Sequence, residues 1–335
     1  LEGDVGSGKT AVAAITAYAV VNSRPKDKKS GLPALAGTLQ VAYMAPTEIL
    51  ASQHFQSFIG FFRELPISIA LITGSGCYKF PSKLDRNKPT PISRAQLLKW
   101  VANGDIAMVV GTHALIQKSV KFAHLAYAIV DEQHRFGVKQ RKALAHKGDA
   151  PPHFLSMTAT PIPRTLALTI YGDLDLSILD ELPKGRAGVE TSVILKGKTA
   201  GAYEVMRAEI QSGRQAYVIC ARIDEPEPEK ELALIAKSAK AEAVRLKKEV
   251  FPEFEIGLLH GKMDQKAKDA AMKLFADGTH HILVATSVVE VGVNVPNATV
   301  IMIEGAERFG LAQLHQLRGR VMRSSHKARC FLVTK

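Results

Sequence analysis

Short apolar runs alternate with helical patterns along the whole chain, and this alternation most restricts how it can fold. Apolar runs such as Leu39–Met44 and Ile282–Thr286 are separated by stretches with helical periodicity such as Glu48–Glu64. Strands joined by helices pair in parallel, and a parallel sheet needs helices on both faces. The sequence therefore predicts an α/β fold, with parallel sheets that are covered by helices on both faces.

The same pattern gives each element a position. The expected strands are Leu39–Met44, Ser68–Thr73, Ile106–Val110, Tyr127–Val130, Phe154–Thr158, Thr191–Leu195, Ala216–Cys220, Ile256–His260, Ile282–Thr286, Thr299–Ile303 and Cys330–Thr334. The expected helices are Thr10–Val21, Glu48–Glu64, Ser93–Ala102, Ala202–Gln211, Leu232–Glu249, Gln265–Phe275 and Leu311–Leu317. Two stretches rich in proline and charge are expected to be surface loops, Ser75–Pro91 and Asp224–Glu231.

The chain has 335 residues, which exceeds one core of ordinary size and favours two domains. Asp180–Arg186 is polar, has proline and glycine close together, and is typical of a domain linker. We therefore expect domains at 1–182 and 183–335. The chain opens on Leu1 rather than methionine, so we expect a piece of a longer protein, truncated at both ends, whose first strand is missing.

Residues 3–10 match the phosphate-loop pattern G-x4-G-K-T. Glycines let backbone N–H groups curl around a phosphate at a helix N-terminus, and the following stretch is helical in pattern. Lys9 would supply a cation to the β- and γ-phosphates, and the Thr10 hydroxyl would ligate Mg²⁺. The predicted nucleotide-binding residues are Gly3, Asp4, Val5, Gly6, Ser7, Gly8, Lys9 and Thr10.

The apolar run before Asp131 and Glu132 ends in these two carboxylates. In a parallel sheet this places both at the carboxyl edge of a strand, beside the phosphate loop. Asp131 would hold Mg²⁺, and Glu132 would orient and deprotonate the attacking water. An acidic strand end that faces solvent is common, but its combination with a phosphate loop favours a site that hydrolyses ATP with Mg²⁺.

Near the end of the chain, Arg320 and Arg323 stand three residues apart after Gly319. Such a pair suits guanidinium groups that stabilise the transferring phosphoryl group, a role worth roughly 10³ to 10⁵ in rate. A helix face rich in arginine, or simple DNA contacts, would give the same pattern. If the arginines and the phosphate loop belong to different domains, only the closed form hydrolyses ATP, which couples hydrolysis to motion.

The net charge is +12, and residues 1–182 and 183–335 share it equally. A polyanion held by both halves would explain this excess, and so would a basic surface that serves only solubility. The three cysteines form no C-x-x-C motif, and no apolar run is long enough to span a membrane. We therefore expect reduced thiols, a cytoplasmic protein and no membrane partner.

Long sequence strings resemble the motors of superfamily-two DEAD/DEAH-type helicases, and within them the RecG family of DNA translocases. They include GDVGSGKT, MAPTEILASQH, GTHALIQ, VDEQHRFGVKQR, MTATPIPRTLALTIYGDLD, ATSVVEVGVNVPNATV and IEGAERFGLAQLHQLRGRV. The resemblance covers nearly the whole chain and implies two RecA-like domains. Met322 departs from the glycine of this family, which puts the aim of Arg323 in doubt.

The resemblance also implies roles for residues that the spacing does not assign. Gln133, His134, Thr158 and Thr160 would couple the ATP state to DNA, and Gly292 would lie in the nucleotide-sensing motif. The residues implied to line the DNA path are Pro46, Thr47, Gly74, Ser75, Thr112, His113, His260, Gly261 and Thr286. For each of these, a capping or turn role is an alternative. The remaining histidines show no metal-ligand spacing.

The resemblance implies an ATP-dependent helicase that acts on branched or duplex DNA, such as forks and Holliday junctions, in recombination and repair. Replication-fork proteins are candidate partners, and the motor is expected to be monomeric. The alternatives are the motor of a transcription-repair coupling factor, an RNA helicase and a DNA-binding scaffold with an inactive site. In the family, a wedge domain and a C-terminal element lie outside the motor. We expect residues 1–335 alone to be poorly stable and unable to regress a fork.

Overall fold

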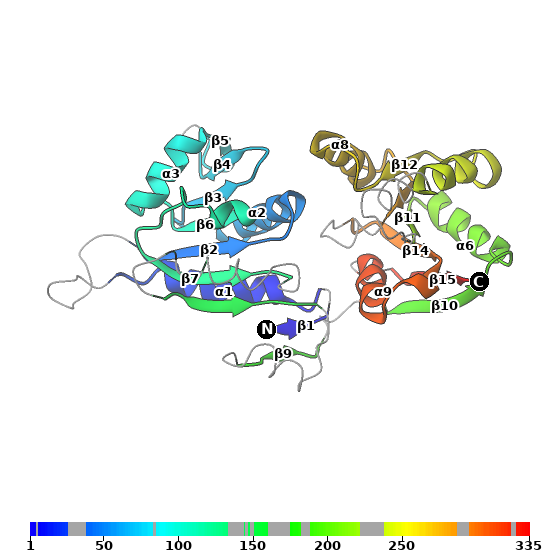
Figure 1. Cartoon of the computed structure of the whole chain (residues 1–335), viewed down its shortest axis with the longest axis horizontal. Coiled ribbons are helices and arrows are strands. Elements are labelled where there is room, and N and C mark those ends of the chain that lie inside the picture. Colours follow the sequence, from blue (N-terminus) through cyan, green and yellow to red (C-terminus); the bar gives the residue numbers. More distant parts are fainter. Residues whose placement is uncertain are drawn as a thin grey trace. The chain divides into compact units, whose positions relative to one another are not determined.

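The computed structural model places the chain in two compact units (Figure 1). One unit comprises Leu1–Gly3 and Gly8–Asp180, and the other comprises Asp4–Ser7 and Glu181–Lys335. The structure describes the chain except residues 5, 26–37, 83–84, 133–143, 145–146, 148–150, 160–174, 182–187, 222–237, 287–294 and 323–325, and except the side chains of 265–266. Most of the expected linker and the expected loop Asp224–Glu231 thus lie outside the described residues.

The first unit is built on a seven-stranded sheet with the order β5-β4-β3-β6-β2-β7-β8. Five neighbouring strands from β3 to β8 run parallel, whereas β4 and β5 pair antiparallel at one edge. The elements are β1 (Glu2–Gly3), α1 (Lys9–Val21), β2 (Gln40–Met44), α2 (Glu48–Phe62), β3 (Ile69–Ile72), β4 (Cys77–Phe80), β5 (Thr90–Pro91), α3 (Arg94–Asn103), β6 (Met108–Gly111), the 3-10 helix η1 (His113–Ile116), β7 (Leu125–Val130), β8 (His153–Ser156) and β9 (Ile178–Leu179).

Both faces of this sheet are buried under helices. Successive residues of each strand point to opposite sides, so each strand contributes side chains to both faces. In β2, Val41 and Tyr43 pack with α1 and α2 on one face. Ala42 and Met44 pack with α3 and η1 on the other face. This two-sided burial explains why the strands are continuous apolar runs rather than alternating ones.

The second unit has a six-stranded sheet with the order β10-β15-β14-β11-β13-β12, and every pair is parallel. Its elements are β10 (Val189–Leu195), α6 (Ala200–Gln211), β11 (Gln215–Cys220), the π-helical turn η3 (Leu246–Val250), β12 (Ile256–Leu259), α8 (Gln265–Ala276), β13 (Ile282–Ala285), β14 (Ala298–Glu304), the 3-10 helix η5 (Ala306–Arg308), α9 (Leu311–Arg318), the 3-10 helix η6 (Gly319–Val321) and β15 (Ala328–Thr334).

Helices cover both faces of this second sheet as well. Met206 and Ile210 of α6 pack with Val218 of β11 on one face. On the other face, the ring of Tyr217 lies 4.9 Å from that of Phe275 in α8, centroid to centroid. The predicted fold class, parallel sheets with helices on both faces, is therefore confirmed in each unit.

The expected strands and helices are confirmed where they are described, with ends that shift by at most two residues. The expected surface loop Ser75–Pro91 is wrong in part. It contains β4, which pairs antiparallel with β3, and β5, which pairs with β4. Cys77 and Phe80 of β4 are buried. The sequence conceals this strand because the exposed Tyr78 and the half-buried Lys79 separate its two buried residues.

The expectation that the first strand is missing is also wrong in part. Glu2–Gly3 forms the short strand β1, which pairs in parallel with Ile178–Leu179 of β9. On its other side, Glu2 bridges Thr158, just beyond the end of β8. The Gly3 amide donates to the Thr158 carbonyl at 3.3 Å, and the Thr158 amide donates to the Leu1 carbonyl at 3.1 Å. The backbone that leads into the phosphate loop is therefore paired on both sides.

Candidate functional site

The phosphate loop has a backbone that only glycine adopts readily. Gly6 and Gly8 have φ of 80° and 102°, in the left-handed region. A side chain at Gly8 would meet no atom within 4 Å, so its backbone angle and not the available space requires glycine. The Ser7 amide donates to the Asp4 carbonyl at 3.1 Å. Val5 lies outside the described residues.

Helix α1 begins at Lys9, directly after the left-handed Gly8. The Lys9 side chain is buried, and its Nζ donates to the Gly3 carbonyl at 2.6 Å. The cation is therefore held against the first residue of the loop, at the N-terminus of the helix. Thr10 lies in the first turn of the same helix and is half-buried. The N-terminus of a helix carries partial positive charge, which suits a phosphate group.

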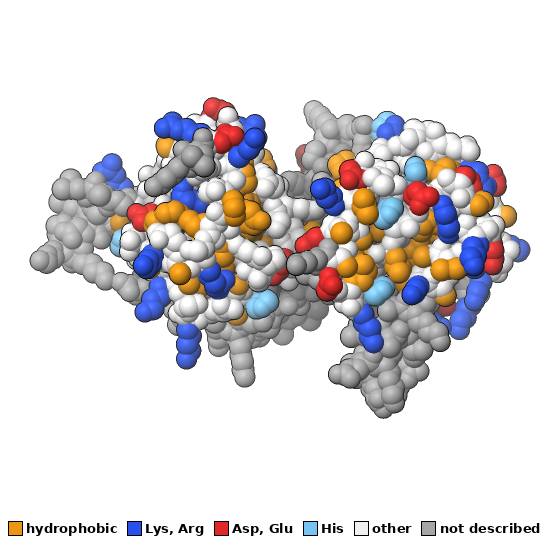
Figure 2. All heavy atoms as spheres, turned by 90° about the horizontal axis from the view of Figure 1, so that it is seen from above, with side chains coloured by type: hydrophobic (Ala, Val, Ile, Leu, Met, Phe, Trp, Pro, Cys, Tyr) orange, Lys and Arg blue, Asp and Glu red, His pale blue; other side chains and the backbone are white. Residues whose placement is uncertain are grey.

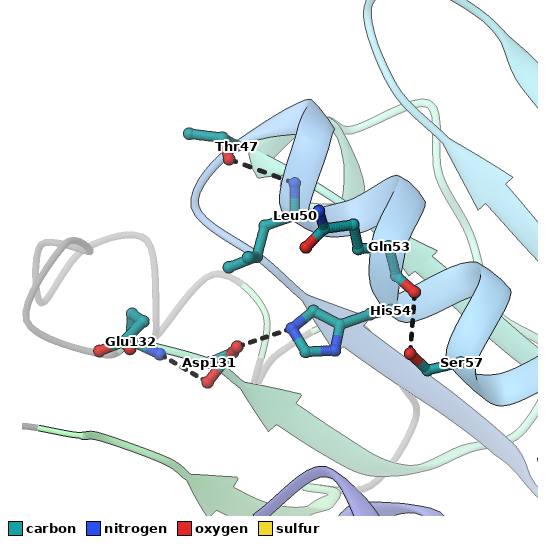
Figure 3. Close-up of polar contacts among 7 residues, drawn as sticks. All are labelled: Thr47, Leu50, Gln53, His54, Ser57, Asp131 and Glu132. Atoms are coloured by element: carbon teal, nitrogen blue, oxygen red, sulfur yellow. Dashed lines mark hydrogen bonds and ion pairs between the residues drawn. The ribbon is translucent and has the colours of Figure 1, made fainter. Parts of the chain in front are cut away.

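Asp131 and Glu132 directly follow β7, so they lie at the carboxyl edge of the sheet (Figure 3). The Glu132 amide donates to Asp131 Oδ1 at 3.0 Å, and His54 Nε2 lies 2.9 Å from Asp131 Oδ2. Glu132 has φ of 49°, and among the described residues it is the one non-glycine residue with positive φ. This uncommon backbone turns the chain sharply between the two carboxylates.

Asp131 is ionised although it is buried. Burial alone would raise the pKa of its carboxyl group. The hydrogen bond and charge of His54, the charge of Lys9 and the Glu132 amide together lower this pKa below its ordinary value. The buried Tyr43 hydroxyl faces the opposite effect, because burial and the nearby Asp131 charge raise its pKa well above the usual value. Asp131 therefore offers a negative charge in a site that already holds the Lys9 cation.

The residues implied to contact DNA in the first unit also follow parallel strands. Pro46 and Thr47 come after β2, Gly74 and Ser75 after β3, and Thr112 and His113 after β6. Because β2, β3, β6 and β7 are parallel, these residues lie at the same edge of the sheet as Asp131. Thr158 follows β8 at this edge too.

Several of these residues have structural partners, as the capping alternative predicts. Thr47 caps α2 by accepting a hydrogen bond from the Leu50 amide at 3.4 Å. Thr112 caps η1 in the same way, through the Ala114 amide. The Gly74 amide donates to Glu48 Oε1 at 2.6 Å, and a side chain on Gly74 would approach that oxygen to 2.7 Å.

In the second unit, His260 and Gly261 follow β12, and Thr286 follows the neighbouring parallel strand β13. Burial is the main cause that lowers the pKa of His260, and nearby lysines, first Lys268, lower it further. The Thr286 amide donates to the Leu259 carbonyl at 3.2 Å. These residues share the carboxyl edge of the second sheet.

Arg320 lies in η6 and is buried. Met322 follows it with φ of −77°, a backbone that any residue adopts, and its side chain is also buried. The backbone at this position therefore does not require the glycine of the RecG family. The predicted residues Gln133, His134, Thr160, Gly292 and Arg323 lie outside the described residues.

The structure adds two residues that the sequence did not assign, His54 and Tyr43. His54 is 77 positions away from Asp131 in the sequence, so no motif spacing reveals their contact. Tyr43 lies within a buried apolar strand and looks like an ordinary core residue.

The residues at this site fit a nucleotide with Mg²⁺. The left-handed glycines curl the backbone just before α1, Lys9 supplies a cation, and Asp131 supplies a carboxylate oxygen whose pKa is lowered. No group of three or more His, Cys, Asp or Glu residues suited to a metal occurs among the described residues. Mg²⁺ in phosphate-transfer sites is usually held by one or two protein ligands together with substrate phosphates, so this donor set suffices.

Positive side chains are spread over both units rather than gathered in one patch, on the face that Figure 2 presents. This distribution agrees with a net charge that is shared by the two halves of the chain. In the part of the chain that the structure describes, no helix is both long and apolar enough to cross a membrane.

Comparisons with known proteins agree with the motifs. Residues 1–169 match the model of the DEAD/DEAH box helicase family, and residues 198–325 match the helicase conserved C-terminal domain. The chain is 47% identical over 334 residues to the ATP-dependent DNA helicase RecG of Synechocystis sp., covering 100% of this chain and 36% of that protein. It is 45% identical to RecG of Bacillus subtilis, covering 99% of this chain and 44% of that protein.

Solved structures give the same result. A structure of RecG bound to a three-way DNA junction is 39% identical, with a TM-score of 0.72, over 100% of this chain and 39% of that chain. The DNA-bound helicase MrfA is 17% identical, with a TM-score of 0.65, over 99% of this chain and 46% of that one, and shows the shared fold. The chain thus spans less than half the length of these proteins. The resemblance to RecG is confirmed, and the chain belongs to the DEAD/DEAH box helicase family.

Proposed function

We propose that this chain is the ATP-hydrolysing motor of a DNA translocase of the RecG type, which acts on branched DNA such as replication forks and Holliday junctions. The observation that carries the ATP part is the position of the Asp131 carboxylate directly after β7, near enough to Lys9 for its charge to help lower the pKa of Asp131. The DNA part is supported by the identity to DNA helicases along the whole chain. The structure of the helicase MrfA, at 17% identity, supports only the fold.

The residues at the phosphate loop would divide the chemistry among themselves. Lys9 would bind the β- and γ-phosphates, and Thr10 and Asp131 would hold Mg²⁺, which supplies charge neutralisation on the phosphates when it is bound. Glu132 would accept the proton of the attacking water. Arg320 and Arg323 would stabilise the negative charge of the transferring phosphoryl group.

The residues at the carboxyl edges would form the track for DNA. Their short polar side chains and backbone amides suit phosphate contacts, which position a duplex without reading its sequence. Gln133, His134, Thr158 and Thr160 are proposed to couple this track to ATP, and Gly292 is proposed to sense the nucleotide. The corresponding domains are 1–182 for ATP binding and 183–335 for the helicase C-terminal part.

The proposal extends to the setting of the protein. Because the relatives named above are DNA helicases of bacteria, we propose a location in the bacterial cytosol at the nucleoid. There the motor would work as a monomer in recombination and repair, with replication-fork proteins as partners.

Steady-state phosphate release by the full-length protein tests this function. It is measured with forked DNA, linear duplex, single-stranded DNA, RNA and no nucleic acid. We expect forked DNA to stimulate ATP hydrolysis most. Equal stimulation by linear duplex would favour the motor of a transcription-repair coupling factor instead. Stimulation by RNA alone, or no hydrolysis at all, would contradict the proposal.

A further inference from the structure

The imidazole of His54 is bonded to the carboxylate that is proposed to hold Mg²⁺, although no helicase role was assigned to it above. Its Nε2 lies 2.9 Å from Asp131 Oδ2, and the two side chains are only 13% and 11% exposed. Figure 3 shows the ring extending from α2 toward the end of β7. A carboxylate only accepts hydrogen bonds, so Nε2 carries the hydrogen and donates it, whether or not the ring is charged.

The His54 ring has little freedom to turn away from this bond. Its centroid lies 4.8 Å from that of Tyr43, whose side chain is fully buried in β2. Tyr43 packs in turn against Phe58, which lies one turn further along α2. The centroids of these two rings are 5.1 Å apart in an edge-to-face arrangement. The imidazole is therefore fixed between the sheet and its own helix, and it presents Nε2 in one direction.

Each oxygen of Asp131 accepts a hydrogen bond from a fixed donor. Oδ2 accepts from His54, and Oδ1 accepts from the Glu132 amide at 3.0 Å. Two bonds to different oxygens fix the plane of the carboxylate, while the remaining lone pairs stay available for a metal or its water. Donors to a ligating carboxylate commonly set metal affinity by roughly 10- to 100-fold.

The same helix also begins at the proposed DNA track. Thr47 caps α2, and Glu48 in its first turn accepts from the Gly74 amide. Thr47 and Gly74 are both proposed DNA contacts. His54 follows Thr47 by seven residues, which corresponds to about 10 Å along a helix. Helix α2 thus joins the two segments that would contact the DNA backbone to the His54 side chain, which donates to Asp131 Oδ2.

We propose that His54 is a positioning residue that ties the Asp131 carboxylate to α2, and that this link couples DNA contact at the start of α2 to Mg²⁺-nucleotide binding at Asp131. The inference rests on the proposed function. The inference assigns part of the coupling to the hydrogen bond between His54 and Asp131. Neither residue is among the four proposed earlier to couple ATP to DNA, which are Gln133, His134, Thr158 and Thr160. Coupling between two ligands is reciprocal, so each must change the affinity for the other by the same factor.

The test uses full-length protein with four versions of α2: the parent, His54→Ala, His54→Gln and Gln56→Ala. Glutamine keeps an N–H donor at a similar reach from the backbone. Gln56 is exposed on the same helix and serves as the matched control. The dissociation constant of a fluorescent ADP is measured with Mg²⁺ and with EDTA, each with and without forked DNA, and the melting temperature is measured in EDTA.

We expect His54→Ala to weaken ADP binding by roughly 10- to 100-fold with Mg²⁺ while binding in EDTA stays unchanged. Forked DNA should change the Mg²⁺-ADP affinity of the parent, and this change should disappear in His54→Ala. His54→Gln should recover most of both effects, and Gln56→Ala should match the parent. If His54→Ala melts early, the comparison of His54→Gln with the parent decides the outcome.

Equal weakening with Mg²⁺ and with EDTA would show a merely structural role for His54 and overturn the inference. So would a DNA effect that persists in His54→Ala, or one that is absent from the parent. Phosphate release by the parent with forked DNA tests the proposed function separately. A parent that hydrolyses ATP normally beside a His54→Ala variant with unchanged Mg²⁺-ADP binding would overturn the inference alone.

Discussion

Asp131 owes its charge to its neighbours rather than to water. Burial opposes ionisation of this carboxyl group, and the hydrogen bond and charge of His54, the charge of Lys9 and the Glu132 amide outweigh that cost. The neighbouring Glu132 has a different environment, because its backbone turns through positive φ directly after the strand. This difference agrees with the two proposed roles, Asp131 as a ligand of Mg²⁺ and Glu132 as a base.

Replacing Lys9 and replacing Glu132 should each abolish ATP hydrolysis but should affect ATP binding differently. Lys9→Ala removes the cation, so we expect it to abolish turnover and to weaken ATP binding. Glu132→Gln removes the base but leaves the loop intact, so it should abolish turnover and still bind ATP. Phosphate release and equilibrium nucleotide binding check both variants. Turnover near that of the parent in either one would contradict the assigned role.

Met322 gives a second test at the scale of one residue. If its side chain displaces Arg323, Met322→Gly should raise kcat and leave the KM for ATP nearly unchanged. The reason is that an arginine that stabilises the transferring phosphoryl group acts mainly in the transition state. The Met322 side chain is buried, so the same change should also lower the melting temperature. Steady-state kinetics and thermal melting separate the two effects. An unchanged kcat would show that methionine is tolerated there.

At the scale of elements, a buried glutamine is the first residue of an interior strand in each unit. Gln40 is the first residue of β2, and its Nε2 donates to the carbonyls of Val101 and Ile106. Gln215 is the first residue of β11, and its Nε2 donates to the carbonyls of Phe275 and His280. In both units these carbonyls belong to a helix end and to the segment that leads into the next parallel strand. The same pair of side-chain hydrogen bonds therefore joins a strand to a neighbouring helix in each of the two units.

Replacing either glutamine should be costly, because leucine fills the volume but leaves buried carbonyls without donors. We expect Gln40→Leu and Gln215→Leu each to lower the free energy of unfolding by about 3 kcal/mol. Urea denaturation followed by circular dichroism measures this loss. The control Gln211→Leu lies on the exposed end of α6 and should change stability by about 0.5 kcal/mol or less. A loss that small at Gln40 would contradict the argument.

Elements that pack on two faces were predictable from the sequence, and elements that depend on distant partners were not. The apolar run of β2 is long and uninterrupted, so its strand could be predicted directly. β4 has a single buried residue at each end and forms only because β3 offers a free edge. At the site, the phosphate loop and Asp131 carry local motifs. The His54 contact arises only when the sheet brings α2 beside the end of β7.

At the scale of the whole molecule, each unit carries its own buried thiols. Cys77 lies in the first unit, and Cys220 and Cys330 lie in the second. Burial raises the pKa of Cys77 above its usual value, that of Cys220 to about 12, and that of Cys330 to about 11. Since the thiolate is the reactive form, folded protein should protect all three thiols.

Thiol labelling should therefore report the opening of each unit separately. At pH 8 we expect an alkylating reagent to leave all three cysteines unmodified until denaturant is added. Mass spectrometry of the labelled peptides then shows which unit opens first. Above pH 9, an unfolded chain ionises thiols that the folded protein keeps neutral, so stability should fall as pH rises from 9 toward 12. Rapid labelling at Cys330 without denaturant would contradict this burial.

The shared positive charge predicts how the whole molecule binds DNA. Phosphate contacts should dominate affinity, so the logarithm of the association constant should fall linearly with the logarithm of salt concentration, with a slope of about −0.9 per phosphate neutralised. Base sequence at fixed fork geometry should matter little. Fluorescence anisotropy across a salt series measures the slope. Shallow salt dependence with strong sequence preference would indicate a reader of bases instead.

The amino ends and the carboxyl ends of the strands in each sheet differ in the residues that they carry. The glutamines that fix strand to helix lie at the amino ends of β2 and β11, whereas the proposed nucleotide and DNA contacts follow the carboxyl ends. Substitutions at the amino ends of these strands can therefore lower stability without touching the proposed nucleotide and DNA contacts. The temperature at which each unit unfolds thus depends on residues that lie a full strand length away from those proposed to bind ATP and DNA.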